Sequence, residues 1–264
     1  MTEAKLAEFD GERAKLYEEA ISEYPDARKE DIEILKKLLN PQLNERIIGF
    51  GEGNGYFCQT IAEKIGKNGM YLVLDPSEDQ LKNLKKRINL PQIEIKKLGA
   101  EEINTLPNYF DKIWSFGAFH HCPNQTRAMK KIYNSLKKGG IAVICDVFQG
   151  GNLAKHFDTQ VARYCITGHE VKFLSEEFAK TLCLLAGFKE SNIKIINLPQ
   201  KWIFNSEEDL GRFIYKIHAL TLLPGDEKEK IRKTLEECKK ILGIQLKDNK
   251  YYLNWDMKAL IVKK

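Results

Sequence analysis

A glycine-rich run and an acid that follows it are the residues of this sequence whose types and spacing best support ligand binding. Gly51, Gly53 and Gly55 follow a short apolar run, and Asp75 ends the next one, twenty residues after Gly55. A strand that enters such a turn and then a helix presents backbone N–H groups and a helix N-terminus to a charged ligand. Asp75 can then accept hydrogen bonds from both ribose hydroxyls of an adenosine.

The spacing of the glycines discriminates between two adenosine-containing ligands, a dinucleotide and S-adenosylmethionine. Dinucleotide sites have the pattern G-x-G-x-x-G. Residues 51–55 read G-x-G-x-G instead, and Tyr56 follows. A turn that uses glycine only for backbone freedom is a third interpretation, and Asp75 at the end of the next apolar run argues against it.

Strands that alternate with helices must position these residues. The pattern predicts an α/β fold, a doubly wound, Rossmann-like and mostly parallel seven-stranded sheet. It also predicts a helical N-terminal segment and helical insertions after strand five and near the C-terminus. Ligands bind such sheets at the carboxyl ends of the strands. The expected strands are 46–50, 70–74, 93–95, 112–116, 141–147, 193–198 and 251–262, and the expected helices are two within 3–40, then 56–65, 77–88, 126–136, 152–165, 175–186, 206–223 and 226–242.

Six short blocks occur in an order that is typical of one enzyme family. With them the sequence resembles the class I S-adenosylmethionine-dependent methyltransferases, especially the small-molecule branch that includes the ubiquinone/menaquinone C-methyltransferases. The resemblance covers about residues 45–147. The blocks are residues 47–55, 75–77, 100–103, 110–115, 119–121 and 136–140.

The resemblance implies S-adenosyl-L-methionine as the cofactor, with the glycine turn at its methionine end, Asp75 at the ribose and Pro76 against adenine. The chain departs from the family pattern at Gly49 and Gly99, where the family has acids. We expect Glu52 and Glu101 to compensate from neighbouring positions. The predicted cofactor-binding residues are Gly51, Glu52, Gly53, Gly55, Asp75, Pro76, Ala100, Glu101 and Ser115.

Histidine is the first candidate for catalysis, because a base with a pKa near neutrality suits proton removal from an acceptor. His120 and His121 follow the fourth strand, where the resemblance places the methyl group, and packing of either ring at the strand end is the alternative. His156 and His169, in the region after strand five, are secondary candidates. No metal site is predicted, because the spacing of a known ligand set is missing.

Length and composition indicate the domain organisation and the state of the cysteines. The 264 residues carry a net charge of +5, and 43% are hydrophobic, which suits one large domain with a full core. We expect a single methyltransferase domain over 1–264, with an N-terminal helical cover at 1–40, a cofactor-binding core at 41–147, and substrate-cover helices with the last two strands at 148–264. The six cysteines lack a C-x-x-C pair and are interpreted as reduced thiols.

Three functions follow, and the first is preferred: methyl transfer to a small-molecule acceptor at O, N or C. The second is a protein of the same fold with altered or lost methyl transfer, which Gly49 and Gly99 motivate. The third is an RNA or protein methyltransferase. Lysines interleaved with acids argue against a nucleic-acid partner, no apolar run is long enough for a membrane span, and the charged N-terminus favours the cytoplasm.

Overall fold

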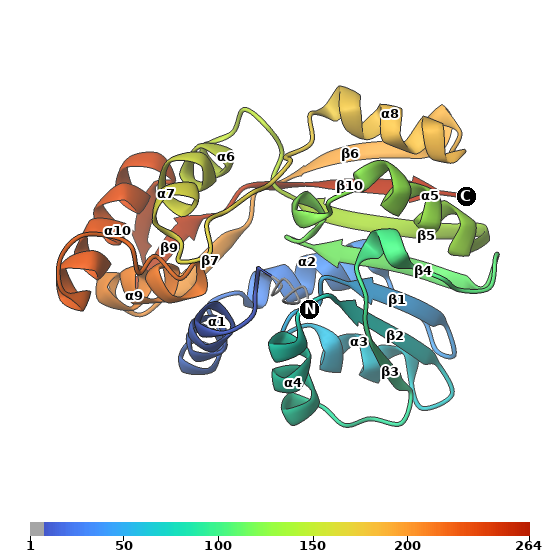
Figure 1. Ribbon diagram of the computed structural model, residues 1–264, viewed down its shortest axis with the longest axis horizontal. Helices are drawn as coiled ribbons and strands as arrows, with labels where there is room; N and C mark the ends of the chain where they lie inside the picture. The colour runs from blue at the N-terminus through green and yellow to red at the C-terminus, as the bar shows by residue number, and fades with distance from the viewer. Residues whose placement is uncertain (1–7) are drawn as a thin grey trace, which may run out of the picture. The chain divides into compact units, whose positions relative to one another are not determined.

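A seven-stranded sheet is the largest element of the computed structural model, which describes residues 8–264 (Figure 1). The strand order is β3-β2-β1-β4-β5-β10-β6, and all pairs are parallel except the two that β10 makes, antiparallel to β5 and to β6. This confirms the predicted doubly wound, mostly parallel sheet. The strands are β1 Arg46–Phe50, β2 Met70–Asp75, β3 Ile93–Lys97, β4 Phe110–Phe116, β5 Leu136–Asp146, β6 Ile193–Leu198 and β10 Met257–Lys263.

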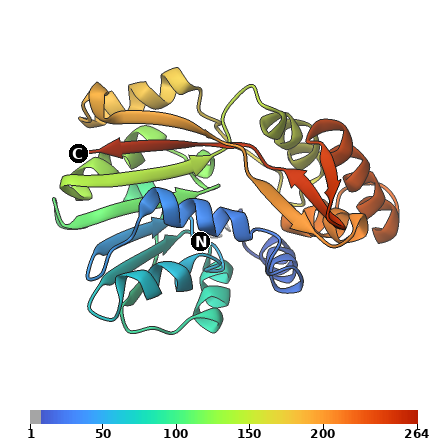
Figure 2. The ribbon, with the colours of Figure 1, turned by 180° about the vertical axis from the view of Figure 1, so that it is seen from behind.

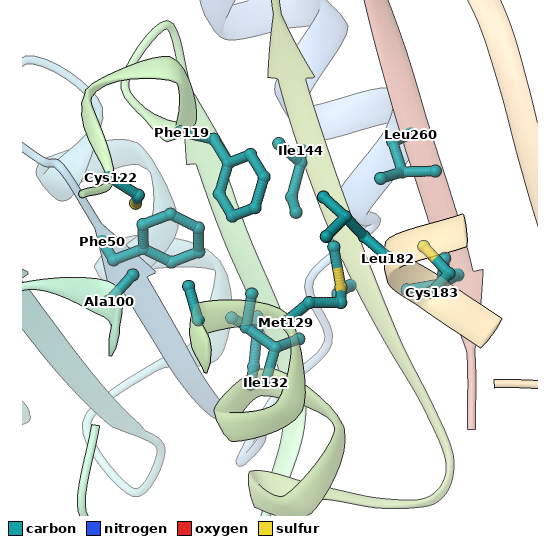
Figure 3. Close-up of a cluster of buried hydrophobic side chains, with 14 of the residues drawn as sticks. Phe50, Ala100, Phe119, Cys122, Met129, Ile132, Ile144, Leu182, Cys183 and Leu260 are labelled. Atoms are coloured by element: carbon teal, nitrogen blue, oxygen red, sulfur yellow. The ribbon is translucent and has the colours of Figure 1, made fainter. Parts of the chain in front are cut away.

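Helices cover both faces of this sheet, as a mostly parallel sheet requires, because its central strands are apolar on both sides. Figure 2, the reverse view, shows α3 in front of the strands. On the other face, Met129 of α5 and Leu182 of α8 pack with Ile144 and Leu260 of the strands into one apolar core (Figure 3). The helices are α3 Cys58–Ile65, α4 Glu78–Arg87, α5 Gln125–Ser135 and α8 Glu176–Ala186.

The chain divides into two compact units, and the sheet belongs to the one made of residues 32–149, 171–198 and 257–264, called unit 2. Unit 1 consists of residues 1–31, 150–170 and 199–256. The structure describes residues 8–31 of the first segment and all of the other two. In unit 1, α9 packs against α1 and α10, beside a three-stranded antiparallel sheet of order β7-β9-β8. Its elements are α1 Glu12–Glu23, α6 Asn152–His156, α7 Ala162–Tyr164, β7 Lys201–Phe204, α9 Glu207–Ile217, α10 Glu227–Ile241, β8 Ile244–Lys247 and β9 Lys250–Asn254, and α2 Lys29–Leu39 continues from unit 1 into unit 2.

Several predicted helix starts are confirmed by their caps. Ser77, Ser175 and Ser206 each accept a hydrogen bond from a backbone N–H three residues further on, which satisfies a donor that the first turn leaves free. The helix expected from Tyr56 begins at Cys58 instead, because the preceding residues form the glycine turn.

The predicted last strand, 251–262, is wrong as a single element. It is two strands in two different sheets, β9 and β10, which the segment Trp255–Asp256 separates. No glycine or proline marks this break in the sequence. The assignment of 1–40 and 148–264 as covers of an acceptor site stays a prediction. Among residues 8–264, no helix combines the length and the apolar character that a bilayer crossing needs.

Candidate active site

The glycine turn lies at the switch point of the sheet, where the strand order reverses between β1 and β4. Gly51, Gly53 and Gly55 all have positive φ, and the Gly51 N–H donates to the Leu74 carbonyl oxygen at 2.8 Å. A Cβ at Gly51 would lie 2.2 Å from the Ala118 Cβ, so only glycine fits there. The turn therefore brings the ends of β1, β2 and β4 together at one edge.

Asp75, the last residue of β2, is fixed by two backbone hydrogen bonds. Its Oδ2 accepts from the Gly53 N–H at 2.8 Å and its Oδ1 accepts from the Ser77 N–H at 2.9 Å. The side chain is buried, whereas Pro76 beside it is exposed and can contact a ligand with its ring. The carboxylate thus couples the glycine turn to the start of α4 and is held at the switch point.

Glu52 occupies the space that a side chain at Gly49 would need. A Cβ built at Gly49 would lie 2.1 Å from Glu52 Oε1 and 2.8 Å from the Tyr71 hydroxyl oxygen. The Tyr71 hydroxyl donates to Glu52 Oε1, and the Cys58 thiol donates to Oε2 at 3.4 Å. Burial raises the pKa of Glu52 to about 8, and the nearby Asp75 carboxylate acts in the same direction.

Glu101 likewise occupies the space that a side chain at Gly99 would need. A Cβ at Gly99 would lie 2.9 Å from both carboxylate oxygens of Glu101. Glu101 belongs to the 3-10 turn Ala100–Glu102, in which the Glu102 carboxylate accepts from the Gly99 N–H at 2.8 Å and Ala100 is buried. An acid at each of two family positions is therefore replaced by glycine, and the carboxylate of a nearby glutamate fills the space.

In the part of the chain that the structure describes, some buried polar atoms near the turns have no hydrogen-bond partner. They are Ser115 Oγ on β4, Gln80 Oε1 on α4 and Glu101 Oε2. Ser115 Oγ lies 3.8 Å from the Cβ position of Gly51, and Gln80 Oε1 lies 3.7 Å from that of Gly53. A buried acceptor without a partner costs about 1–3 kcal/mol, so such atoms mark the place of a polar ligand. Gln80 was not predicted, although a glutamine on the buried face of α4 is a signal that was available.

His120 is held by Asp146, the last residue of β5. The His120 backbone N–H donates to Asp146 Oδ2 at 2.9 Å, and the ring Nδ1 lies 2.5 Å from Oδ1. Oδ1 also accepts from the Val147 N–H at 2.7 Å, and both side chains are buried. In the tautomer whose Nδ1–H donates to the Asp146 carboxylate, Nε2 carries no proton and is an acceptor. Such a ring can remove a proton from an acceptor molecule.

The other predicted histidines differ in position and surroundings. His121 is half-buried, and its ring centroid lies 4.1 Å from that of His120. His156 and His169 both belong to unit 1, where His169 stacks on Phe157 with a centroid distance of 5.0 Å. Unit 2 therefore joins His120 and His121 to the same sheet as the glycine turn.

Comparison with known proteins identifies the part of the chain that carries this geometry. Residues 48–144 match the family model described as "Methyltransferase domain". A tRNA U34 carboxymethyltransferase from Syntrophotalea carbinolica is 29% identical over 109 residues, which are 40% of this chain and 33% of that protein. A chloroplastic 2-methyl-6-phytyl-1,4-hydroquinone methyltransferase 2 from Oryza sativa is 28% identical over 158 residues, 60% of this chain and 42% of that one. The matches thus span a third to two fifths of these relatives.

Solved structures have the same fold at low sequence identity. Phosphoethanolamine N-methyltransferase 2 from Haemonchus contortus, in complex with phosphomonomethylethanolamine and S-adenosylhomocysteine, superposes with a TM-score of 0.66 at 18% identity. The match covers 95% of this chain and 56% of that one. Residues 48–144 are therefore similar to a methyltransferase domain, and the chain has the Rossmann-like fold of the methyltransferase structures that it matches.

Proposed function

We propose that this protein binds S-adenosylmethionine at the glycine turn and transfers its methyl group to a small-molecule acceptor. The observation that carries the proposal is the meeting of the glycine turn, the fixed carboxylate of Asp75 and the unpartnered buried oxygens of Ser115 and Gln80. These features lie within or beside the methyltransferase domain match. The cofactor supplies an electrophilic methyl group on a sulfonium sulfur.

Each residue of the site has a role that its chemistry supports. The turn at Gly51 and Gly53 lets the methionine end approach the backbone, and the buried Glu52 carboxyl ionises when the positive ammonium group binds beside it. Asp75 accepts from the ribose hydroxyls, and Pro76 packs against the adenine ring. The Ala100 backbone and the unpartnered Glu101 Oε2 face the adenine edge, where an exocyclic amine needs an acceptor.

His120 is the proposed general base. The Asp146 carboxylate orients its ring and stabilises the imidazolium that forms when Nε2 takes a proton from the acceptor. A positioned base of this kind typically contributes about 100- to 10,000-fold to the rate. His121, whose ring lies beside that of His120, orients the acceptor.

Two other functions stay open, each with a specific observation behind it. The glycines at positions 49 and 99 favour a protein of this fold with altered or lost methyl transfer, although Glu52 and Glu101 fill the vacated space. The tRNA-modifying relative favours an RNA acceptor. Incubation with labelled cofactor separates these functions, because label enters the small-molecule fraction, bulk RNA, bulk protein or none of them.

Calorimetric titration with S-adenosylhomocysteine tests the cofactor site. We expect binding, and we expect Asp75→Ala to weaken it roughly 10- to 150-fold, the equivalent of hydrogen bonds to a charged group. Asp79→Ala, the same substitution at a more exposed position on α4, is the matched control and leaves the affinity unchanged. Absence of heat with the folded protein would contradict the proposal, and binding of NAD instead would favour the dinucleotide alternative.

A further inference from the structure

Arg13, in the first turn of α1, is a charged side chain that is almost entirely buried, with an exposed fraction of 2%. Its Nη1 donates to the Glu8 carboxylate, to the Thr167 hydroxyl at 2.8 Å and to the Gly168 carbonyl oxygen at 3.3 Å. The central carbon of the guanidinium also lies 3.9 Å from the centroid of the Phe9 ring. All these residues belong to unit 1. We call Arg13, Glu8, Thr167 and Gly168 together the guanidinium site.

The hydrogen bonds of this guanidinium are unevenly distributed. Nη1 carries two N–H groups and faces three acceptors, whereas the buried Nε has no hydrogen-bond partner among residues 8–264. A buried donor without a partner costs stability, and a lysine would serve one group of acceptors without that cost. Pairing inside the protein therefore leaves unused the fork of donors that distinguishes arginine from lysine.

Glu8 supplies the counter-charge of Arg13, and it is the more accessible member of the pair. The Glu8 side chain is 25% exposed, against 2% for Arg13. A partly exposed ion pair contributes little to stability, so Glu8 can leave Arg13 at small cost, provided that another anion balances the buried guanidinium. The Glu8 carboxylate thus occupies, next to solvent, a space that another carboxylate can fill.

The backbone of α1 favours an anion at the same end of the helix. α1 begins after Gly11, which has no side chain, so within the described chain no side-chain cap bonds the N–H groups of the first turn. These N–H groups give the helix N-terminus a partial positive charge, which adds to that of Arg13. A cation is repelled by both charges, and a neutral group leaves the guanidinium unbalanced. The ligand that suits the site is therefore an anion.

We propose that the guanidinium site binds the carboxylate of a small-molecule ligand, which displaces Glu8 and forms two parallel hydrogen bonds with Arg13. Glu8 is then an internal competitor that fills the site when the ligand is absent. A carboxylate brings the single negative charge that Glu8 takes away, and its two oxygens match the donor fork of a guanidinium. The site goes beyond the proposed methyl transfer and does not depend on it.

Sodium acetate is the probe, and its binding is measured by NMR on the ¹⁵N-labelled full chain. The Arg13 Nε–H signal, assigned by its loss in Arg13→Lys, reports on the guanidinium, and the Gly168 backbone N–H gives the Kd in every variant. We expect acetate to shift both signals to saturation. We expect Glu8→Gln to lower the Kd about 5- to 10-fold, because the competitor that fills the site for most of the time is weakened.

Two further variants distinguish the site from a general effect of charge. Glu12→Gln removes one negative charge from an exposed position in the same helical turn and leaves the Kd unchanged. Arg13→Lys keeps the positive charge but loses the fork of donors, and we expect the Kd to rise roughly 10-fold. Glu8→Gln leaves the buried arginine in place, so its result decides the proposal even if Arg13→Lys does not fold.

Sodium chloride at the same ionic strength and inorganic phosphate are titrated in parallel. Equal shifts of the Arg13 Nε–H signal with chloride and acetate, or the same acetate Kd in wild type and Glu8→Gln, would overturn the site. Tighter binding of phosphate than of acetate, with the same dependence on Glu8, would overturn the assignment to a carboxylate. The affinity for S-adenosylhomocysteine is unchanged in Glu8→Gln, and failure of that ligand to bind the wild type contradicts the proposed function alone.

Discussion

Replacement of Glu52 by glutamine tests whether its buried carboxyl titrates near neutral pH. Because burial raises the pKa of Glu52 to about 8 from an ordinary value of 4.5, the protonated form is favoured in the folded state. The stability that this form contributes is complete below pH 4.5 and is lost as the pH rises towards 8. At about 1.4 kcal/mol for each pH unit, the loss between pH 5 and 7 amounts to roughly 2–3 kcal/mol, because the unfolded carboxyl is still partly protonated at pH 5.

The assay is urea denaturation of wild type and Glu52→Gln at pH 5, 6, 7 and 8. The glutamine variant is uncharged at every pH. We therefore expect the difference in free energy of unfolding, variant minus wild type, to rise by roughly 2–3 kcal/mol between pH 5 and 7. Glu63→Gln, an exposed position on α3, is the matched control and follows the wild type. Parallel pH profiles of wild type and Glu52→Gln would show that the carboxyl is already ionised at pH 5.

The remaining predictions concern one backbone position and two histidines. Gly51→Ala should lower the free energy of unfolding by roughly 2 kcal/mol more in urea denaturation than Gly139→Ala, because both glycines have positive φ but only Gly51 has a neighbour within contact distance of a new Cβ. His120→Asn should lower kcat at least 100-fold and leave calorimetric binding of S-adenosylhomocysteine unchanged; equal rates would assign His120 to packing. Because the pKa of His156 is lowered to about 4, the free energy of unfolding should fall by up to about 3 kcal/mol as the pH drops from 6.5 to 4. His156→Phe should abolish this loss in acid titrations followed by circular dichroism.

Features that depend on local sequence were predictable. The glycine turn, Asp75 and the caps at Ser77, Ser175 and Ser206 are encoded within a few residues of where they act. The strands of the large sheet were also predictable, because burial on both faces requires near-continuous apolar runs. The second sheet was not predicted, because β7 and β8 have four residues each and their burial patterns alternate or are mostly exposed.

Features that depend on tertiary contacts could not be predicted from the sequence. The partnership of His120 with Asp146 joins residues 26 positions apart, and it needs the parallel pairing of β4 and β5 to bring the two strand ends together. The relation of Glu52 to Gly49 was expected only as compensation. In the structure the Glu52 carboxylate occupies the space that a side chain at position 49 would fill. It is held there by the hydroxyl of Tyr71, a residue of the neighbouring strand β2.

The position of β10 inside the large sheet has a consequence for folding during synthesis. β10 lies between β5 and β6, and its Val262 pairs with Ile193 of β6 while its Lys258 pairs with Asp146 of β5. Residues 199–256 are made after β6 and before β10, so β6 has no neighbouring strand in this sheet until the ribosome has translated that whole segment. Such non-local pairing is slow and leaves a strand edge exposed to other chains. In the nascent protein, β6 therefore stays unpaired in this sheet until β10 has been synthesised.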